Sequence, residues 1–106
     1  VAKAKRAIAE EMRLQVGQHV AAIEKVEAEA VAKPMTTKRD WNHRNFVVTS
    51  RFDDAKKLRD GMQQIVEEMC TVEEFFKGEA AIVTAIKSLI VEVDSDLQDA
   101  EGAVQN

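Results

Sequence analysis

The residues whose types could support chemistry are few, and their spacing assembles neither a catalytic nor a metal site. The only histidines are His19 and His43, and no His-x-x-x-His or His-Glu-x-x-His spacing is present. The sequence places no activating base near the one cysteine, Cys70, which is expected at a buried or boundary position. His19 is expected at the edge of the apolar stripe of the first helix, as a boundary residue between its buried and exposed faces, and His43 in a solvated loop. The chain is therefore predicted not to be an enzyme, with no catalytic residue, metal ligand or cofactor.

Several carboxylates lie close together in the sequence, but they do not form a site. Residues 94–101 contain four acids, yet they lack the glycine and the terminal glutamate that a calcium loop requires at its sixth and twelfth positions. The pairs Glu67/Glu68 and Glu73/Glu74 are adjacent in sequence, and adjacent residues do not face each other on a helix. We interpret these acids as solvated helix faces.

The best candidate for a contact surface is a short basic and aromatic segment. Its candidate partner-binding residues are Lys38, Arg39, Trp41, His43, Arg44 and Phe46. Arg and Trp are enriched at protein–protein hot spots, and basic residues among aromatics can also bind phosphate and stack on bases. Residues 33–59 hold eight basic side chains against three acidic ones, whereas residues 60–106 hold eleven acidic against two basic. These segments either neutralise each other in the fold or leave an exposed basic patch for an anionic partner.

Two functions follow as hypotheses. The first is a non-catalytic helical-bundle module for protein–protein interaction or assembly. Its partner is another protein or a second copy of the chain, in a homo-oligomer formed through the first or the last helix. The alternative is binding of nucleic acid or another anionic ligand through residues 38–59. A net charge of −4 and the lack of a known nucleic-acid motif count against the alternative, and interspersed glutamates in residues 1–32 count against a membrane partner.

The elements that must position these residues are helices. Apolar residues of the stretch Ile82–Val104 recur in steps of three and four, which places them on one helix face. Residues 2–32 and 50–70 carry similar stripes, and the chain has only four glycines and one proline to break them. We therefore predict an all-α fold: an elongated, antiparallel up-down-up three-helix bundle with coiled-coil-like packing and room for a short fourth helical turn.

The expected boundaries divide a single domain, residues 1–106, as follows: helix about 2–33, connector 34–49, helix about 50–70, turn 71–78 and helix about 79–101. Pro34 ends the first helix, and Ser50 is the expected cap of the second. The connector holds at most a helical turn at residues 40–45, with Trp41 and Phe46 tucked over one end of the bundle. A capping box at Thr71 and Glu74 favours a break there over one long kinked helix.

The predicted core consists of the apolar residues of the three stripes, and Gly61 is expected on the solvent side of the second. The core residues are Ile8, Met12, Val16, Val20, Ile23, Phe52, Leu58, Met62, Ile65, Met69, Ile82, Ile86, Leu89, Val93 and Leu97. One free cysteine and no signal or transmembrane segment are compatible with the cytoplasm, but an exported protein without disulfides would look the same. The compartment stays open, and the initial valine is compatible with a processed or excised piece.

Overall fold

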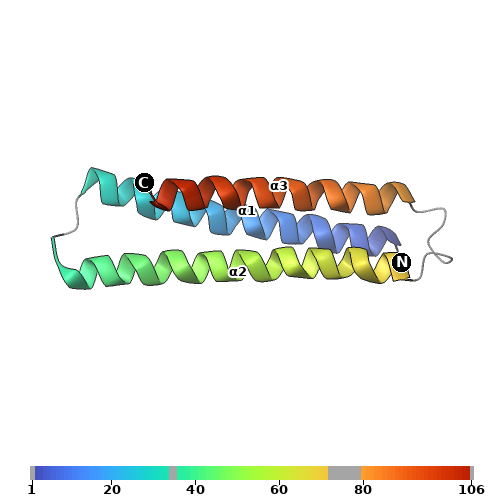
Figure 1. Ribbon diagram of the computed structural model, residues 1–106, viewed down its shortest axis with the longest axis horizontal. Helices are drawn as coiled ribbons and strands as arrows, with labels where there is room; N and C mark the ends of the chain where they lie inside the picture. The colour runs from blue at the N-terminus through green and yellow to red at the C-terminus, as the bar shows by residue number, and fades with distance from the viewer. Residues whose placement is uncertain (1, 34–35, 72–79, 106) are drawn as a thin grey trace.

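The computed structural model describes residues 2–33, 36–71 and 80–105, and these residues form three helices and no strand. Helix α1 spans Ala2–Ala32, α2 spans Lys38–Thr71 and α3 spans Ala80–Gln105. In Figure 1, α1 and α3 run in the same direction, and α2, at the bottom of the view, runs in the opposite direction, so the topology is up-down-up. The bundle measures 59 × 18 × 17 Å. The predicted elongated, all-α three-helix bundle is confirmed.

The core runs along the axis of the bundle and is built from residues that recur every seven positions. In α1 these are Ala9, Val16 and Ile23, and in α3 they are Ile86, Val93 and Ala100, all with at most 2% of their surface exposed. Seven-residue spacing keeps one seam of each helix facing its neighbours, as in coiled coils. All of these residues except Ile23 belong to one contiguous cluster of buried residues, whose other members are Val20, Ala55, Met62, Ile65, Val66, Met69, Ile90 and Leu97.

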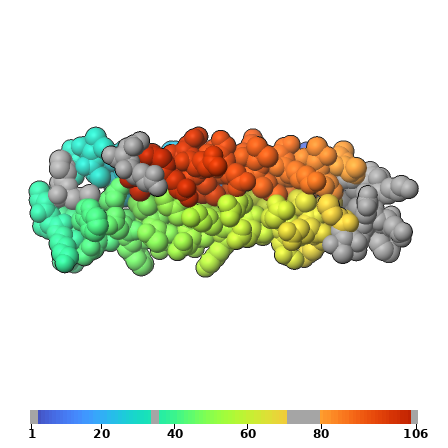
Figure 2. Space-filling view, viewed as in Figure 1, coloured from blue at the N-terminus to red at the C-terminus, as the bar shows by residue number. Residues whose placement is uncertain are grey.

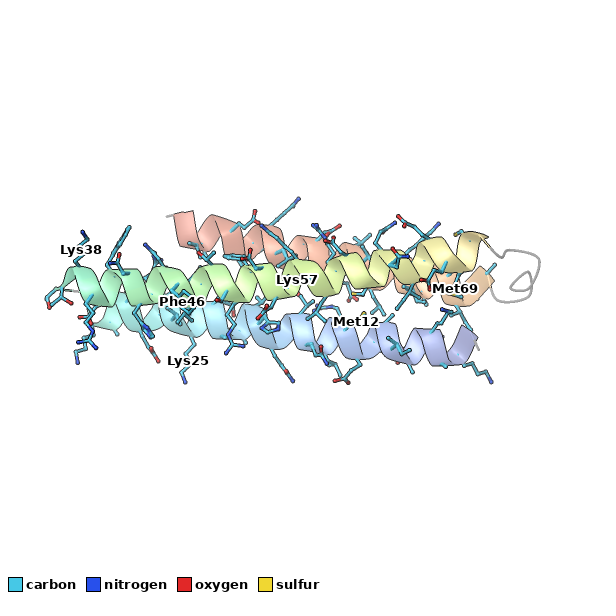
Figure 3. All side chains as sticks on the ribbon, turned by 90° about the horizontal axis from the view of Figure 1, so that it is seen from below. Met12, Lys25, Lys38, Phe46, Lys57 and Met69 are labelled. Carbon is cyan, nitrogen blue, oxygen red and sulfur yellow. The ribbon has the colours of Figure 1, made fainter. Side chains whose placement is uncertain are left out.

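The burial of two residues differs from the prediction: Ile8 in the first apolar stripe and Gly61 in the second helix. Ile8 is 49% exposed, because the core position of that turn belongs to Ala9, seven residues before Val16. Gly61 does not face solvent: a Cβ atom built on it would lie 3.2 Å from Cε of Met12. The absence of a side chain at Gly61 therefore makes room for Met12 between α1 and α2, where Figure 3 places it.

The second helix begins at Lys38 and not at residue 50, so the predicted connector 34–49 and the cap at Ser50 are wrong. Thr37 is the actual cap: the backbone N–H of Asp40 donates to its Oγ1 at 3.1 Å. The carboxylate of Asp40 lies in the first turn, where its negative charge interacts favourably with the positive end of the helix dipole. The polar residues that resemble a connector in the sequence are tolerated because this part of α2 is largely exposed.

The remaining boundaries differ less. Helix α3 continues to Gln105 instead of ending near residue 101, and Thr71 belongs to α2. Residues 72–78 of the predicted turn, and with them the capping box of Thr71 and Glu74, lie outside the described residues. Cys70 is exposed and not buried, because it follows the core position of Met69 by one residue and so lies off the buried face.

Candidate functional site

The three helices do not end level with one another, and this offset creates the candidate site. Arg13 of α1 forms ion pairs with Glu92 and Asp96 of α3, at 3.9 Å and 2.7 Å. The two helices run in the same direction with an equal rise per residue, so Gln105 is level with about residue 24 of α1. Figure 1 shows α3 stopping there while α1 and α2 continue.

The ion pairs between α2 and α3 indicate the same offset. Lys56 and Arg59 of α2 pair with Glu101 and Asp94 of α3, both at 3.5 Å, which puts the end of α3 level with about residue 50 of α2. Residues 25–32 of α1 and 38–49 of α2 thus extend past α3 as a pair. We call them the two-helix end (left in Figures 1 and 2).

Trp41 occupies a core position of α2 that α3 does not cover. Val48, Ala55, Met62 and Met69 follow it at seven-residue intervals, and each of these four is at most 5% exposed. Trp41 itself is 53% exposed. The prediction that it is tucked over the end of the bundle is therefore wrong, and the reason is the length of α3 and not the placement of the tryptophan on its helix.

Arg44 is the second predicted site residue with a definite structural position. Its guanidinium donates to the carboxylate of Glu27 on α1 and, through Nη1, to Oδ1 of Asn45 at 2.9 Å. The Arg44 and Glu27 side chains are only 16% and 20% exposed, the most buried ion pair in the described part of the chain. The Nε atom of Arg44 is buried without a hydrogen-bond partner. Arg44 thus joins α1 to α2 in the two-helix end.

Three of the other predicted site residues lie on the outer face of α2. Arg39, His43 and Phe46 are spaced by four and three residues, which places them together on one side of the helix, and all are exposed. Phe46 is 69% exposed and stands seven residues before Asp53 on that solvated face, so it is not tucked over the bundle either. The six candidates therefore do not form one surface.

Lys38 lies on yet another side of α2. It precedes Arg59 by three seven-residue repeats and so belongs to the edge of the face that α3 covers further along. Figure 3 shows Lys38 at the far end of α2, with Lys57 near the middle of the molecule. Lys38 forms no ion pair with any residue that the structure describes.

Sequence reasoning missed a shallow groove next to the two-helix end. It has a volume of about 270 Å³ and is lined by Thr49, Phe52, Asp53, Lys56, Glu101 and Val104. Phe52 and Val104 supply apolar surface where the last turn of α3 meets α2. Both residues belong to predicted apolar stripes, but only the offset between the helices leaves this surface open.

The basic segment 38–59 is partly neutralised. Arg44, Lys56 and Arg59 pair with acids of α1 or α3, and Nη1 of Arg51 lies 3.2 Å from Nδ1 of His19. His19 is half-buried, as predicted for a boundary residue. Lys38, Arg39, Arg51 and Lys57 remain as exposed cations without an ion pair among the described residues.

The rest of the described chain adds no second site. Over residues 2–33, 36–71 and 80–105, no group of three or more His, Cys, Asp or Glu side chains is placed to hold a metal ion. None of the described helices combines the length and hydropathy needed to cross a membrane. Comparisons with protein-family models, with curated proteins and with solved structures find no match to this chain. A bundle fold alone does not specify a function, so the feature of this chain that bears on function is the two-helix end.

Proposed function

We propose that this bundle is a non-catalytic protein–protein interaction or assembly module that binds through its two-helix end. One observation carries the proposal: Trp41 continues the buried seven-residue series of α2, yet half of its surface is exposed because no third helix reaches it. Tryptophan is among the residues most enriched at hot spots of protein interfaces. A helix seated beside α1 and α2 would complete the core at that end.

The first test is the solution mass by light scattering, from micromolar to millimolar concentration, for the chain and for Trp41→Ala. If the partner is a second copy, the mass rises above 11.8 kDa with concentration and Trp41→Ala abolishes the rise. If the partner is another protein, the chain stays a monomer and amphipathic helical peptides change the emission of Trp41. The proposal is contradicted by association that Trp41→Ala leaves unchanged, or by a monomer whose Trp41 emission no such peptide alters.

The rival function is binding of nucleic acid through residues 38–59. It is supported by the cations of this segment without an ion pair in the described part of the chain, which are Lys38, Arg39, Arg51 and Lys57. Binding to phosphates would weaken steeply as salt is raised. A filter-binding or anisotropy titration with a labelled single-stranded oligonucleotide at low salt tests it, and the absence of binding there removes the rival.

A further inference from the structure

The interface of α3 with the other two helices shows which kind of helix this bundle accepts. Where all three helices pack together, the ion pairs between α3 and its neighbours join acidic residues of α3 to basic residues of α1 or α2. The bases are Arg13, Lys56 and Arg59, and the distances lie between 2.7 and 3.9 Å. Helix α3 carries five acidic residues and one basic residue, Lys87, beside its buried stripe. It is an acidic amphipathic helix whose acids pair with three basic residues of α1 and α2.

The two-helix end carries the same combination of apolar and basic residues on α1 and α2, but no part of α3 covers it. Trp41 continues the core series past the end of α3. The groove lined by Phe52 and Val104 lies between α2 and the last turn of α3, about 16 Å from Trp41 along α2. Lys38 stands three repeats before Arg59, the residue that pairs with Asp94 of α3. The apolar centre and its basic edge thus extend past the point where α3 ends.

The charges at this end call for an anionic group. Residues 25–33 and 36–49 hold five basic side chains and three acidic ones.

We propose that the partner of the two-helix end is a short acidic amphipathic helix, seated in line with α3 and packed against Trp41. This inference rests on the proposed function and specifies the chemistry of its partner. The uncovered length, 8 residues of α1 and 12 of α2, corresponds to about 12–18 Å, so two to three helical turns suffice. A second copy is disfavoured as occupant because it would bring a like-charged surface and a contact too short for the area of a stable dimer.

The test uses the whole chain and two synthetic peptides. The first has the sequence of residues 86–104 of α3, which contains the apolar stripe and the acids but no tryptophan. The second keeps the stripe and replaces the five acids by lysine. Trp41 is the only tryptophan of the chain, so its emission reports contact at the two-helix end directly.

We expect the acidic peptide to shift the emission of Trp41 to shorter wavelength in a saturable titration at low salt. The lysine peptide should bind at least about tenfold more weakly, since like charges oppose it. Lys38→Glu should weaken binding of the acidic peptide several-fold. Lys57→Glu is the matched control, because it makes the same charge change on α2 outside the two-helix end, and it should leave the affinity nearly unchanged. Amide shifts in NMR should change at residues 25–32 and 38–49, which excludes exchange of the peptide for α3.

The outcomes separate this inference from the function on which it rests. Equal or tighter binding of the lysine peptide, or equal effects of Lys38→Glu and Lys57→Glu, overturns the acidic partner but leaves an interaction surface in place. A dimer that Trp41→Ala dissociates also overturns the acidic partner and supports self-assembly. Failure of both peptides to alter Trp41 emission, in a chain that stays monomeric, overturns both proposals.

Discussion

Trp41 and Met62 occupy the same position of the seven-residue repeat in α2, but only Met62 is covered on all sides. Removing the Met62 side chain leaves a cavity in the core, so Met62→Ala should lower the free energy of unfolding by about 2–5 kcal/mol. Trp41→Ala removes a larger side chain, yet it should cost only about 1 kcal/mol because half of that surface already contacts water. Urea unfolding followed by far-UV circular dichroism measures both. An equal or larger loss of unfolding free energy in Trp41→Ala would show that Trp41 stabilises the fold as much as a core residue does.

The two glycines near the middle of α1 and α2 should respond in opposite ways to a larger side chain. A Cβ atom at Gly17 would lie 3.7 Å from Nη1 of Arg13, an ordinary contact, so Gly17→Ala should stabilise the helix by about 0.5–1 kcal/mol. Gly61→Leu should destabilise by about 1–3 kcal/mol, since the added atoms meet Met12 at once. Thermal unfolding of the two variants beside the parent chain tests this pair, and stabilisation by Gly61→Leu would contradict the close approach of α1.

Glu68 should titrate below its ordinary range. Hydrogen bonds from Gln64 and Lys5, together with the charge of Lys5, lower its pKa from the usual 4.5. A lowered pKa means that these contacts stabilise the fold above pH 4.5 and lose that effect as the pH falls through the lowered value. Carboxyl NMR titration should show the midpoint moving back up in Gln64→Ala and Lys5→Ala. An unchanged midpoint in both variants would contradict the contacts. The effect on stability is small, because the Glu68 side chain is exposed to solvent.

At the scale of the elements, the sequence identifies α1 and most of α3, because their apolar stripes are long and regular. The start of α2 is the main error. Polar residues 36–45 resemble a loop, although two signals of a helix are present: Thr37 three residues before Asp40, and Trp41 seven residues before Val48. The ion pair of Arg44 with Glu27 was beyond sequence reasoning, because it depends on how α1 and α2 pack side by side.

The two-helix end should open more readily than the three-helix body. Residues there bury surface against one neighbour only, and local opening follows the density of buried apolar contacts. We therefore expect amides of residues 26–31 and 42–47 to exchange with solvent at a lower free energy of opening than those of residues 9–20 and 55–66. Native-state hydrogen exchange by NMR measures this difference. Equal protection along α2 would show that the missing third helix has no energetic consequence.

At the scale of the whole molecule, the three stripes specify the bundle, but they do not specify how far each helix reaches. The predicted boundaries make the first helix the longest, whereas in the structure parts of both α1 and α2 extend past α3. That offset depends on the pairing of Arg13 with α3 and on the way Lys56 and Arg59 align α2. Such cross-helix alignment is a tertiary property, and it decides which predicted site residues lie next to an open surface.

The elongated shape has a consequence for every experiment that sizes the protein by its hydrodynamics. The radius of gyration is 17.1 Å, whereas a compact domain of 106 residues has about 13 Å. The same scaling gives 17.1 Å for a compact chain of about 220 residues, close to two copies of this one. A monomer should therefore leave a gel-filtration column near the volume of a globular dimer, while light scattering on the same peak reads 11.8 kDa. For a monomer, an elution volume taken alone would therefore indicate a false dimer.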